Sequence, residues 1–84
     1  MNNFWTEKQR QDLDFFNKNI QTWLQNPIYR MKFVVISDGT LKGVYDSFES
    51  ALKYAATTLK AGDYIIQQVL NENEVVNFLA PAVA

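Results

Sequence analysis

Residues 46–59 decide the fold, and they read Asp46-Ser47-Phe48-Glu49-Ser50-Ala51-Leu52-Lys53-Tyr54-Ala55-Ala56-Thr57-Thr58-Leu59. Asp46 and Glu49 have the spacing of a capping box, which satisfies free backbone N–H groups at a helix start. Five apolar residues then fall on one face at helical spacing: Phe48, Ala51, Leu52, Ala55 and Leu59. Gly62 is a typical stop signal. The sequence therefore predicts a central helix over residues 47–60.

A β-hairpin is expected before this helix, over residues 31–45. Its turn is Asp38-Gly39, a strong two-residue hairpin signal because both positions tolerate positive φ. A two-residue loop sets Val35 opposite Lys42. One face then carries Val34, Ile36, Leu41, Gly43 and Tyr45, and the other carries Phe33, Val35 and Val44 with Ser37, Thr40 and Lys42. Both faces are largely apolar, whereas a half-solvated sheet alternates more clearly.

A second hairpin is expected over residues 64–79, with the polar turn 71–74 between two apolar runs. A four-residue loop sets Leu70 opposite Val75. One face then carries Ile65, Gln67, Val69, Val76 and Phe78, and the other carries Ile66, Gln68, Leu70, Val75, Asn77 and Leu79. Residues 80–84 form a short apolar tail.

An amphipathic helix is expected over residues 6–26. Thr6 and Gln9 form a second capping-box pattern, and Pro27 stops the helix. The apolar stripe between them recurs at three- and four-residue steps: Leu13, Phe16, Ile20, Trp23 and Leu24. Asn17-Lys18-Asn19 is a point where the helix can break, because asparagine competes for backbone hydrogen bonds.

These elements predict a single small α+β domain over residues 1–84, in the order α-β-β-α-β-β. The connection through the central helix is long enough for the second and third strands to lie parallel in one sheet. The central helix then covers one sheet face, and the N-terminal helix covers the other or reaches a second subunit.

The composition excludes several classes of function. Eight basic and nine acidic residues leave a net charge of −1, without the global field of a phosphate-backbone binder. The chain has no cysteine and no histidine, so it lacks disulfides and the commonest general base and transition-metal ligand. No apolar run approaches about 18 residues. We expect a soluble cytoplasmic protein without a membrane partner.

Catalysis is not expected either. Each acidic residue has a structural explanation: Asp38 lies in a turn, Asp46 and Glu49 start a helix, and Asp12 belongs to the polar part of the first helix. A serine or threonine nucleophile needs a base, which the absence of histidine makes scarce. The three glycines are isolated and form no phosphate-binding loop. We predict no enzyme, and no catalytic, cofactor-binding or metal-binding residue.

Aromatic residues in and around the first helix are the clearest interaction signal. Trp and Tyr are residue types that anchor protein interfaces. We expect Phe16 and Trp23 near the core. The candidate interface residues are Trp5, Phe15, Tyr29, Phe33 and Val35. The alternative is that these side chains complete a small core.

Three basic residues near the first hairpin are candidate phosphate contacts, namely Arg30, Lys32 and Lys42. The expected register points Lys32 and Lys42 to opposite faces, which divides the patch. Solvated surface charge is therefore the better explanation, and nucleic acid is not the favoured partner.

Most of the chain resembles small uncharacterised bacterial proteins of a domain-of-unknown-function type. The resemblance is carried by residues 23–27 (WLQNP), Phe33-Val34-Val35-Ile36 with Asp38-Gly39, residues 44–47 (VYDS) and residues 65–69 (IIQQV). It implies no activity and no site residues. Separately, residues 45–52 (YDSFESAL) are similar to the strand-to-helix junction of HicB-like antitoxin domains, although the chain lacks the Pro/Gly-rich first strands of that family.

The function predicted from the sequence is that of a non-enzymatic interaction or regulatory module. It acts as a homodimer or as a small subunit of another protein, because two helices are few to cover two apolar sheet faces. The alternatives are a nucleic-acid-associated regulator of antitoxin type and a phage-borne inhibitor of a host enzyme.

Overall fold

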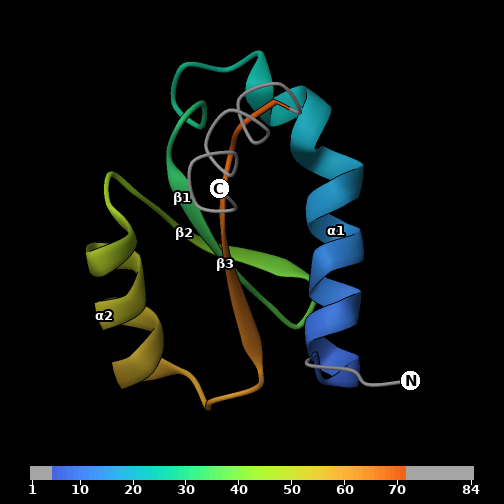
Figure 1. The fold of residues 1–84 in the computed structure, drawn as a ribbon, viewed down its shortest axis with the longest axis vertical. Helices are drawn as coiled ribbons and strands as arrows, with labels where there is room; N and C mark the ends of the chain where they lie inside the picture. Colours follow the sequence, from blue (N-terminus) through green and yellow to red (C-terminus); the bar gives the residue numbers. More distant parts are fainter. Residues whose placement is uncertain (1–4, 72–84) are drawn as a thin grey trace, which may run out of the picture.

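The structure, a computed structural model, describes residues 5–71 of the chain (Figure 1). Within this range it is a small α+β domain with two helices and a three-stranded antiparallel sheet. The elements are α1 (Glu7–Leu24), β1 (Phe33–Ser37), β2 (Thr40–Tyr45), α2 (Phe48–Thr58) and β3 (Tyr64–Gln68). The expected strand 75–79 and the tail 80–84 lie outside the described residues.

The strand order is β2-β1-β3, and β1 pairs antiparallel with both neighbours. β2 and β3 consequently run in the same direction on opposite sides of β1, and α2 connects them. The hairpin between β1 and β2 turns at Asp38 and Gly39, whose φ angles are 55° and 65°. These positive values are those expected for a two-residue turn of this kind.

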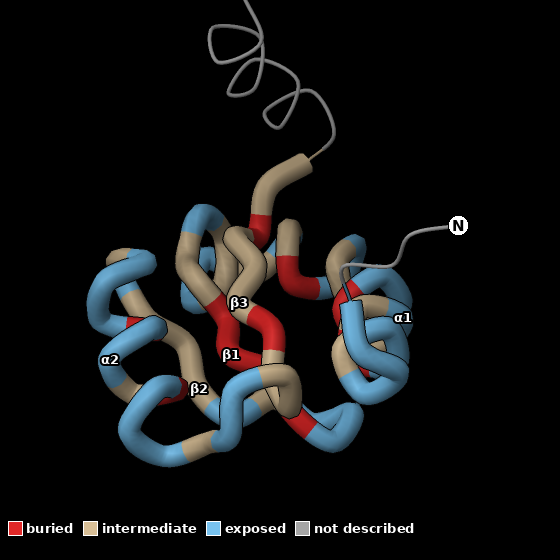
Figure 2. Tube along the Cα trace, turned by 60° about the horizontal axis from the view of Figure 1, so that its bottom comes forward, coloured by how far each residue is buried: buried red, intermediate tan, exposed pale blue. Residues whose placement is uncertain are grey.

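The two helices cover opposite faces of the sheet, so the domain has three layers (Figure 1). β1 is enclosed from both sides, and its residues Val34, Val35 and Ile36 have no exposed surface. In Figure 2 the buried segments follow β1 and β3, while the outer sides of both helices are exposed. The expectation that the central helix covers one face and the N-terminal helix the other is met.

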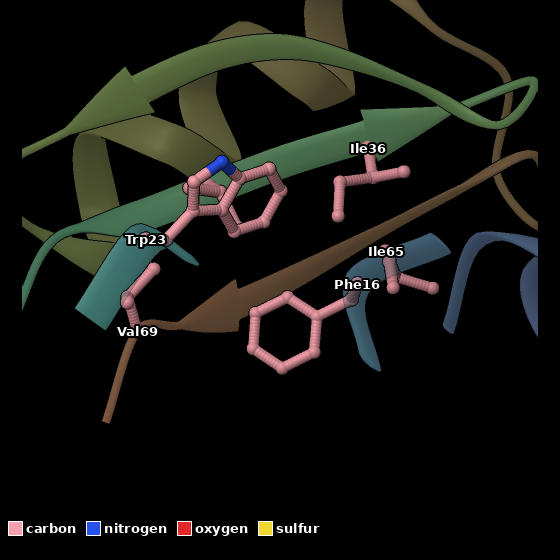
Figure 3. Packing of buried hydrophobic residues seen from close by; sticks show 6 residues of the cluster. Phe16, Trp23, Ile36, Ile65 and Val69 are labelled. Atoms are coloured by element: carbon pink, nitrogen blue, oxygen red, sulfur yellow. The ribbon is translucent and has the colours of Figure 1, made fainter. Parts of the chain in front are cut away.

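The larger core lies between α1 and the sheet. Phe16 and Trp23 contribute from the helix and are 7% and 6% exposed. They pack with Ile36, Ile65 and Val69 of the sheet side (Figure 3). Burying apolar side chains of this size contributes about 1.5–3 kcal/mol each. The prediction that Phe16 and Trp23 lie in the core is confirmed.

The second core, between α2 and the sheet, depends on small residues. Ala51 and Ala55 are fully buried and pack on Val35, which lets the helix approach the strands closely. Tyr45 and Tyr54 stack beside them, with ring centroids 5.7 Å apart.

A β-bulge in β2 changes the predicted register. Val35 pairs with Gly43 rather than with Lys42, whereas Ile36 still pairs with Leu41. Beyond the bulge the predicted faces are wrong, because one extra residue moves every later side chain to the opposite face. Val44 therefore joins the α1 side, and Tyr45 the α2 side.

The start of α2 also differs from the prediction. Its N-cap is Ser47, whose hydroxyl accepts from the N–H of Ser50 at 3.1 Å. Asp46 instead pairs with Lys32, with Nζ and Oδ1 2.5 Å apart. The helix ends at Thr58, two residues before the predicted end.

α1 begins as predicted and runs without a break. Thr6 and Gln9 form both hydrogen bonds of the capping box. The helix continues through Asn19, whose side-chain amide donates to the Phe15 carbonyl at 2.8 Å. A bond back to residue i−4 leaves the helical backbone bonded, so asparagine does not interrupt it here.

Candidate functional site: an apolar groove at the β3 edge

A groove of about 240 Å³ runs along the outer edge of β3, the edge that faces away from β1. Here it is called the edge groove, and its lining residues are Trp5, Gln9, Phe48, Leu52, Tyr64, Ile65 and Ile66. Gln9 lies in the first turn of α1, and Trp5 immediately precedes the N-cap Thr6; Phe48 and Leu52 come from the start of α2. The groove is therefore bordered by both helices and has one strand at its base.

The capping box of α1 also attaches this helix to the loop before β3. Thr6 donates from Oγ1 to the Gly62 carbonyl at 2.6 Å, and Gln9 donates from Nε2 to the Tyr64 carbonyl at 3.1 Å. Gly62 has a φ of 87°, a conformation that favours glycine. These two bonds fix the wall formed by Trp5 and Gln9 against the strand.

The backbone groups along the outer edge of β3 can be assigned from the pairing. The N–H of Val69 donates to the Lys32 carbonyl, and the Met31 N–H donates to the Val69 carbonyl, both at 2.9 Å. Along an antiparallel strand, the backbone N–H and C=O groups of successive residues point alternately to one neighbouring strand and to the other side. The backbone groups of Ile65 and Gln67 therefore also point toward β1. The N–H and C=O groups of Tyr64, Ile66 and Gln68 therefore face the groove side, away from β1.

Exposed apolar side chains flank this edge. Trp5 is 39% exposed, Phe48 50% and Leu52 39%. Phe48 also contacts Phe33 edge-on, with ring centroids 6.2 Å apart. Ile65 packs on the α1 side of the sheet and Ile66 on the α2 side, so the groove extends around the strand edge to both faces.

The candidate interface residues separate into two groups. Trp5 lines the edge groove, and Phe33 borders it through Phe48. Phe15 and Tyr29 pack on Trp23 instead, at centroid distances of 6.0 and 5.6 Å.

Val35 is not part of an exposed interface, contrary to the prediction. It is fully buried beneath Ala51 and Ala55 of α2, so no surface of it is available to a partner.

The candidate phosphate contacts do not form a cluster of available cations. Lys32 is paired with Asp46, and Lys42 is the exposed extra residue of the bulge. Arg30 lies in the turn after α1, where its backbone N–H donates to Asn26. Within residues 5–71, no group of three or more acidic side chains is placed to hold a metal ion.

Asp12 is a feature that the sequence did not indicate. The sequence predicts this side chain in the polar part of the first helix, but it is fully buried against the first hairpin. Its Oδ1 accepts from the Gly39 N–H at 2.8 Å, while Oδ2 is buried without a partner in the described chain. Burial raises the pKa of Asp12, as does nearby Asp38, against the opposing effect of the Gly39 N–H.

Sequence reasoning placed Phe48 and Leu52 on the buried face of the central helix and assigned no role to Tyr64. The available signal was the width of that apolar face, which exceeds what Ala51 and Ala55 cover.

Comparisons with protein families, curated proteins and solved structures found no match for this chain. None of the helices in the described residues is long and apolar enough to span a membrane.

Proposed function

We propose that the protein is a non-enzymatic interaction module and that its contact surface is the edge groove. It works as a homodimer or as a small subunit bound to another protein. The observation that carries this proposal is the combination of an outward-facing strand edge with exposed Trp5, Phe48 and Leu52 on both sides of it.

The physical argument concerns both the backbone and the side chains. An open strand edge is a template for pairing with another chain, and globular proteins usually shield such edges with charge, bulges or covering segments. Here the flanking side chains are apolar and exposed instead. Strand addition at such an edge combines main-chain hydrogen bonds with apolar side-chain pockets, which is a common mode of protein recognition.

Self-association gives the direct test. Light scattering coupled to size exclusion should give a mass above the 9.7 kDa of one chain as concentration rises. Trp5→Ala and Leu52→Ala should shift the mass toward the monomer, because each removes an apolar wall of the groove. Ile28→Ala is the matched control, since Ile28 is 68% exposed and lies outside the groove lining.

A monomeric mass at every concentration would exclude the homodimer. An oligomer that Trp5→Ala and Leu52→Ala leave unchanged, or that Ile28→Ala weakens equally, would show that the contact surface lies elsewhere.

A further inference from the structure

We propose that the Asp38-Gly39 turn is a site of spontaneous backbone isomerisation, and that the hydrogen bond from Gly39 to buried Asp12 blocks the reaction in the folded protein. The product carries an isoaspartyl residue, linked through its side-chain carbon, at position 38. None of these three residues lines the edge groove, so the inference goes beyond the proposed function and does not depend on it.

The reaction needs no reagent other than water. The backbone nitrogen of Gly39 attacks Cγ of the neutral Asp38 carboxyl; the nitrogen loses its proton, the carboxyl loses its hydroxyl group, and one water leaves as a succinimide ring closes. Water then adds to either ring carbonyl. Addition at Cγ restores Asp38, whereas addition at the main-chain carbonyl carbon leaves the chain linked through Cγ. Glycine is the least hindered partner, because it has no Cβ beside the attacking nitrogen.

The folded turn holds Asp38 in a backbone conformation that cannot close this ring. Its φ of 55° lies in the left-handed region, where ψ is about +30 to +60°. With such a ψ, Cβ of Asp38 and the nitrogen of Gly39 lie nearly trans about the Cα–C bond, whereas the succinimide ring requires them to be cis. The peptide group between the two residues must therefore turn over before the nitrogen can reach Cγ.

Asp12 opposes this rotation directly. The turn lies beside α1 (Figure 1), and the Gly39 N–H that must move donates to Oδ1 of Asp12 at 2.8 Å. Oδ2 has no donor in the described chain that could compensate for the loss of this bond. Because a hydrogen bond to a charged group shifts a local equilibrium by about tenfold or more, Asp12 keeps the reactive conformation rare.

Isomerisation would separate the hairpin from α1. The new linkage adds one carbon atom to the main chain between positions 38 and 39, in a two-residue turn that connects the paired Ser37 and Thr40. The Gly39 N–H is then displaced from Asp12, whose buried carboxyl loses its donor. Leaving a buried polar group unbonded is costly, and refolding does not reverse the covalent change. The turn is thus a site of irreversible chemical ageing that the fold protects.

The test measures isoaspartate at position 38 after incubation of the full chain at neutral pH. Peptide mapping by mass spectrometry locates the isomer, because fragmentation distinguishes the two linkages. Folded wild type should isomerise roughly tenfold or more slowly than the same chain in concentrated urea. Asp12→Ala should accelerate the reaction in the folded protein about tenfold. Asp12→Asn retains an oxygen that can accept from Gly39, so its rate should stay close to that of the wild type.

Ser47→Ala is the matched control for lower global stability. It removes the N-cap of α2 without touching the hairpin turn, so isomerisation at Asp38 should increase only as far as the globally unfolded fraction does. Urea unfolding of each variant gives that fraction. Amide exchange of Gly39 in the wild type is a second measurement, independent of whether Asp12→Ala folds. Although Gly39 is exposed, its N–H should exchange slowly.

Four results would overturn the inference. They are wild-type isomerisation as fast in the folded protein as in urea, Gly39 exchange as fast as in an exposed loop, equal rates for Asp12→Ala and Asp12→Asn, and an increase for Asp12→Ala that its unfolded fraction fully explains. The first two would show that the turn opens freely, and the last two would show that the hydrogen bond to Asp12 does not restrain it.

Discussion

At the scale of single residues, the buried carboxyl of Asp12 is expected to make the stability of the fold depend on pH. Its pKa is raised, chiefly by burial, so the folded state binds a proton at this carboxyl more readily than the unfolded state does. Stability should therefore increase as pH falls through the raised pKa, and this gain should level off below the unfolded value of about 3.9.

Asp12→Asn should remove this pH-dependent contribution while keeping an oxygen that can accept from the Gly39 N–H. Urea unfolding from about pH 3 to about pH 7 measures the difference between wild type and variant. As the pH rises toward neutral, the free energy of unfolding of the variant should increase relative to that of the wild type. Asp14→Asn, on an exposed position of the same helix, is the control. A difference for Asp12→Asn that does not vary with pH would contradict the assignment.

Gly43 allows the Tyr45 ring to lie across the strand next to the bulge. A Cβ at this position would lie 2.7 Å from Cε2 of Tyr45. Gly43→Ala should therefore move the ring off its stack with Tyr54 and reduce the free energy of unfolding by about 1–3 kcal/mol. Chemical denaturation measures the loss, and near-ultraviolet circular dichroism reports the displaced tyrosine.

Gly39→Ala is a useful comparison with Gly43→Ala. No atom lies within 4 Å of a Cβ at Gly39, so only the positive φ opposes the substitution. Its cost should be about 1 kcal/mol, without a change in the tyrosine signal. A tyrosine signal that is unchanged in Gly43→Ala would refute the packing explanation.

At the scale of elements, the predicted and the observed N-cap of α2 are different residues, Asp46 and Ser47. Ser47→Ala should cost about 1 kcal/mol, because the hydroxyl accepts from Ser50. Asp46→Ala should cost less, since it removes only an exposed ion pair with Lys32. Thermal or urea unfolding of the two variants decides between them, and a larger loss for Asp46→Ala would restore Asp46 as the cap.

Local sequence signals predicted the elements well where a few neighbouring residues determine the conformation. Thr6 with Gln9 fixed the start of α1, and Asp38-Gly39 fixed the turn between β1 and β2. The bulge at Lys42 was not predictable from the alternation of polar and apolar residues, because both faces of the strand are apolar. A one-residue shift in register therefore places no polar side chain on an obviously unfavourable face.

The parts that sequence reasoning missed depend on residues far apart in the chain. Asp12 looks like a solvated helix residue until the hairpin turn, 27 residues later, packs on it. Gln9 and Tyr64 are 55 positions apart, so their bond and the wall of the edge groove have no local signal. By contrast, the residue type of Trp5 was enough to make it a candidate interface residue, and it lines the edge groove.

At the scale of the whole molecule, two helices are enough to cover both sheet faces, contrary to the shortage that the sequence indicated. Among residues 5–71, β2 and β3 are both edge strands, and the edge groove lies at β3, between the starts of α1 and α2. In this domain the helices cover the two faces of the sheet, and the apolar groove lies at a sheet edge.

The burial of β1 from Val34 to Ser37 has a consequence for the unfolded chain. Phe33-Val34-Val35-Ile36-Ser37 is uncharged, rich in β-branched residues and free of proline, which is the composition of segments that stack into intermolecular β-sheets. In the native domain this strand is hidden by both helices and both neighbouring strands. Variants that loosen either layer should therefore precipitate on heating rather than refold, so solubility after a thermal cycle reports how well β1 remains protected.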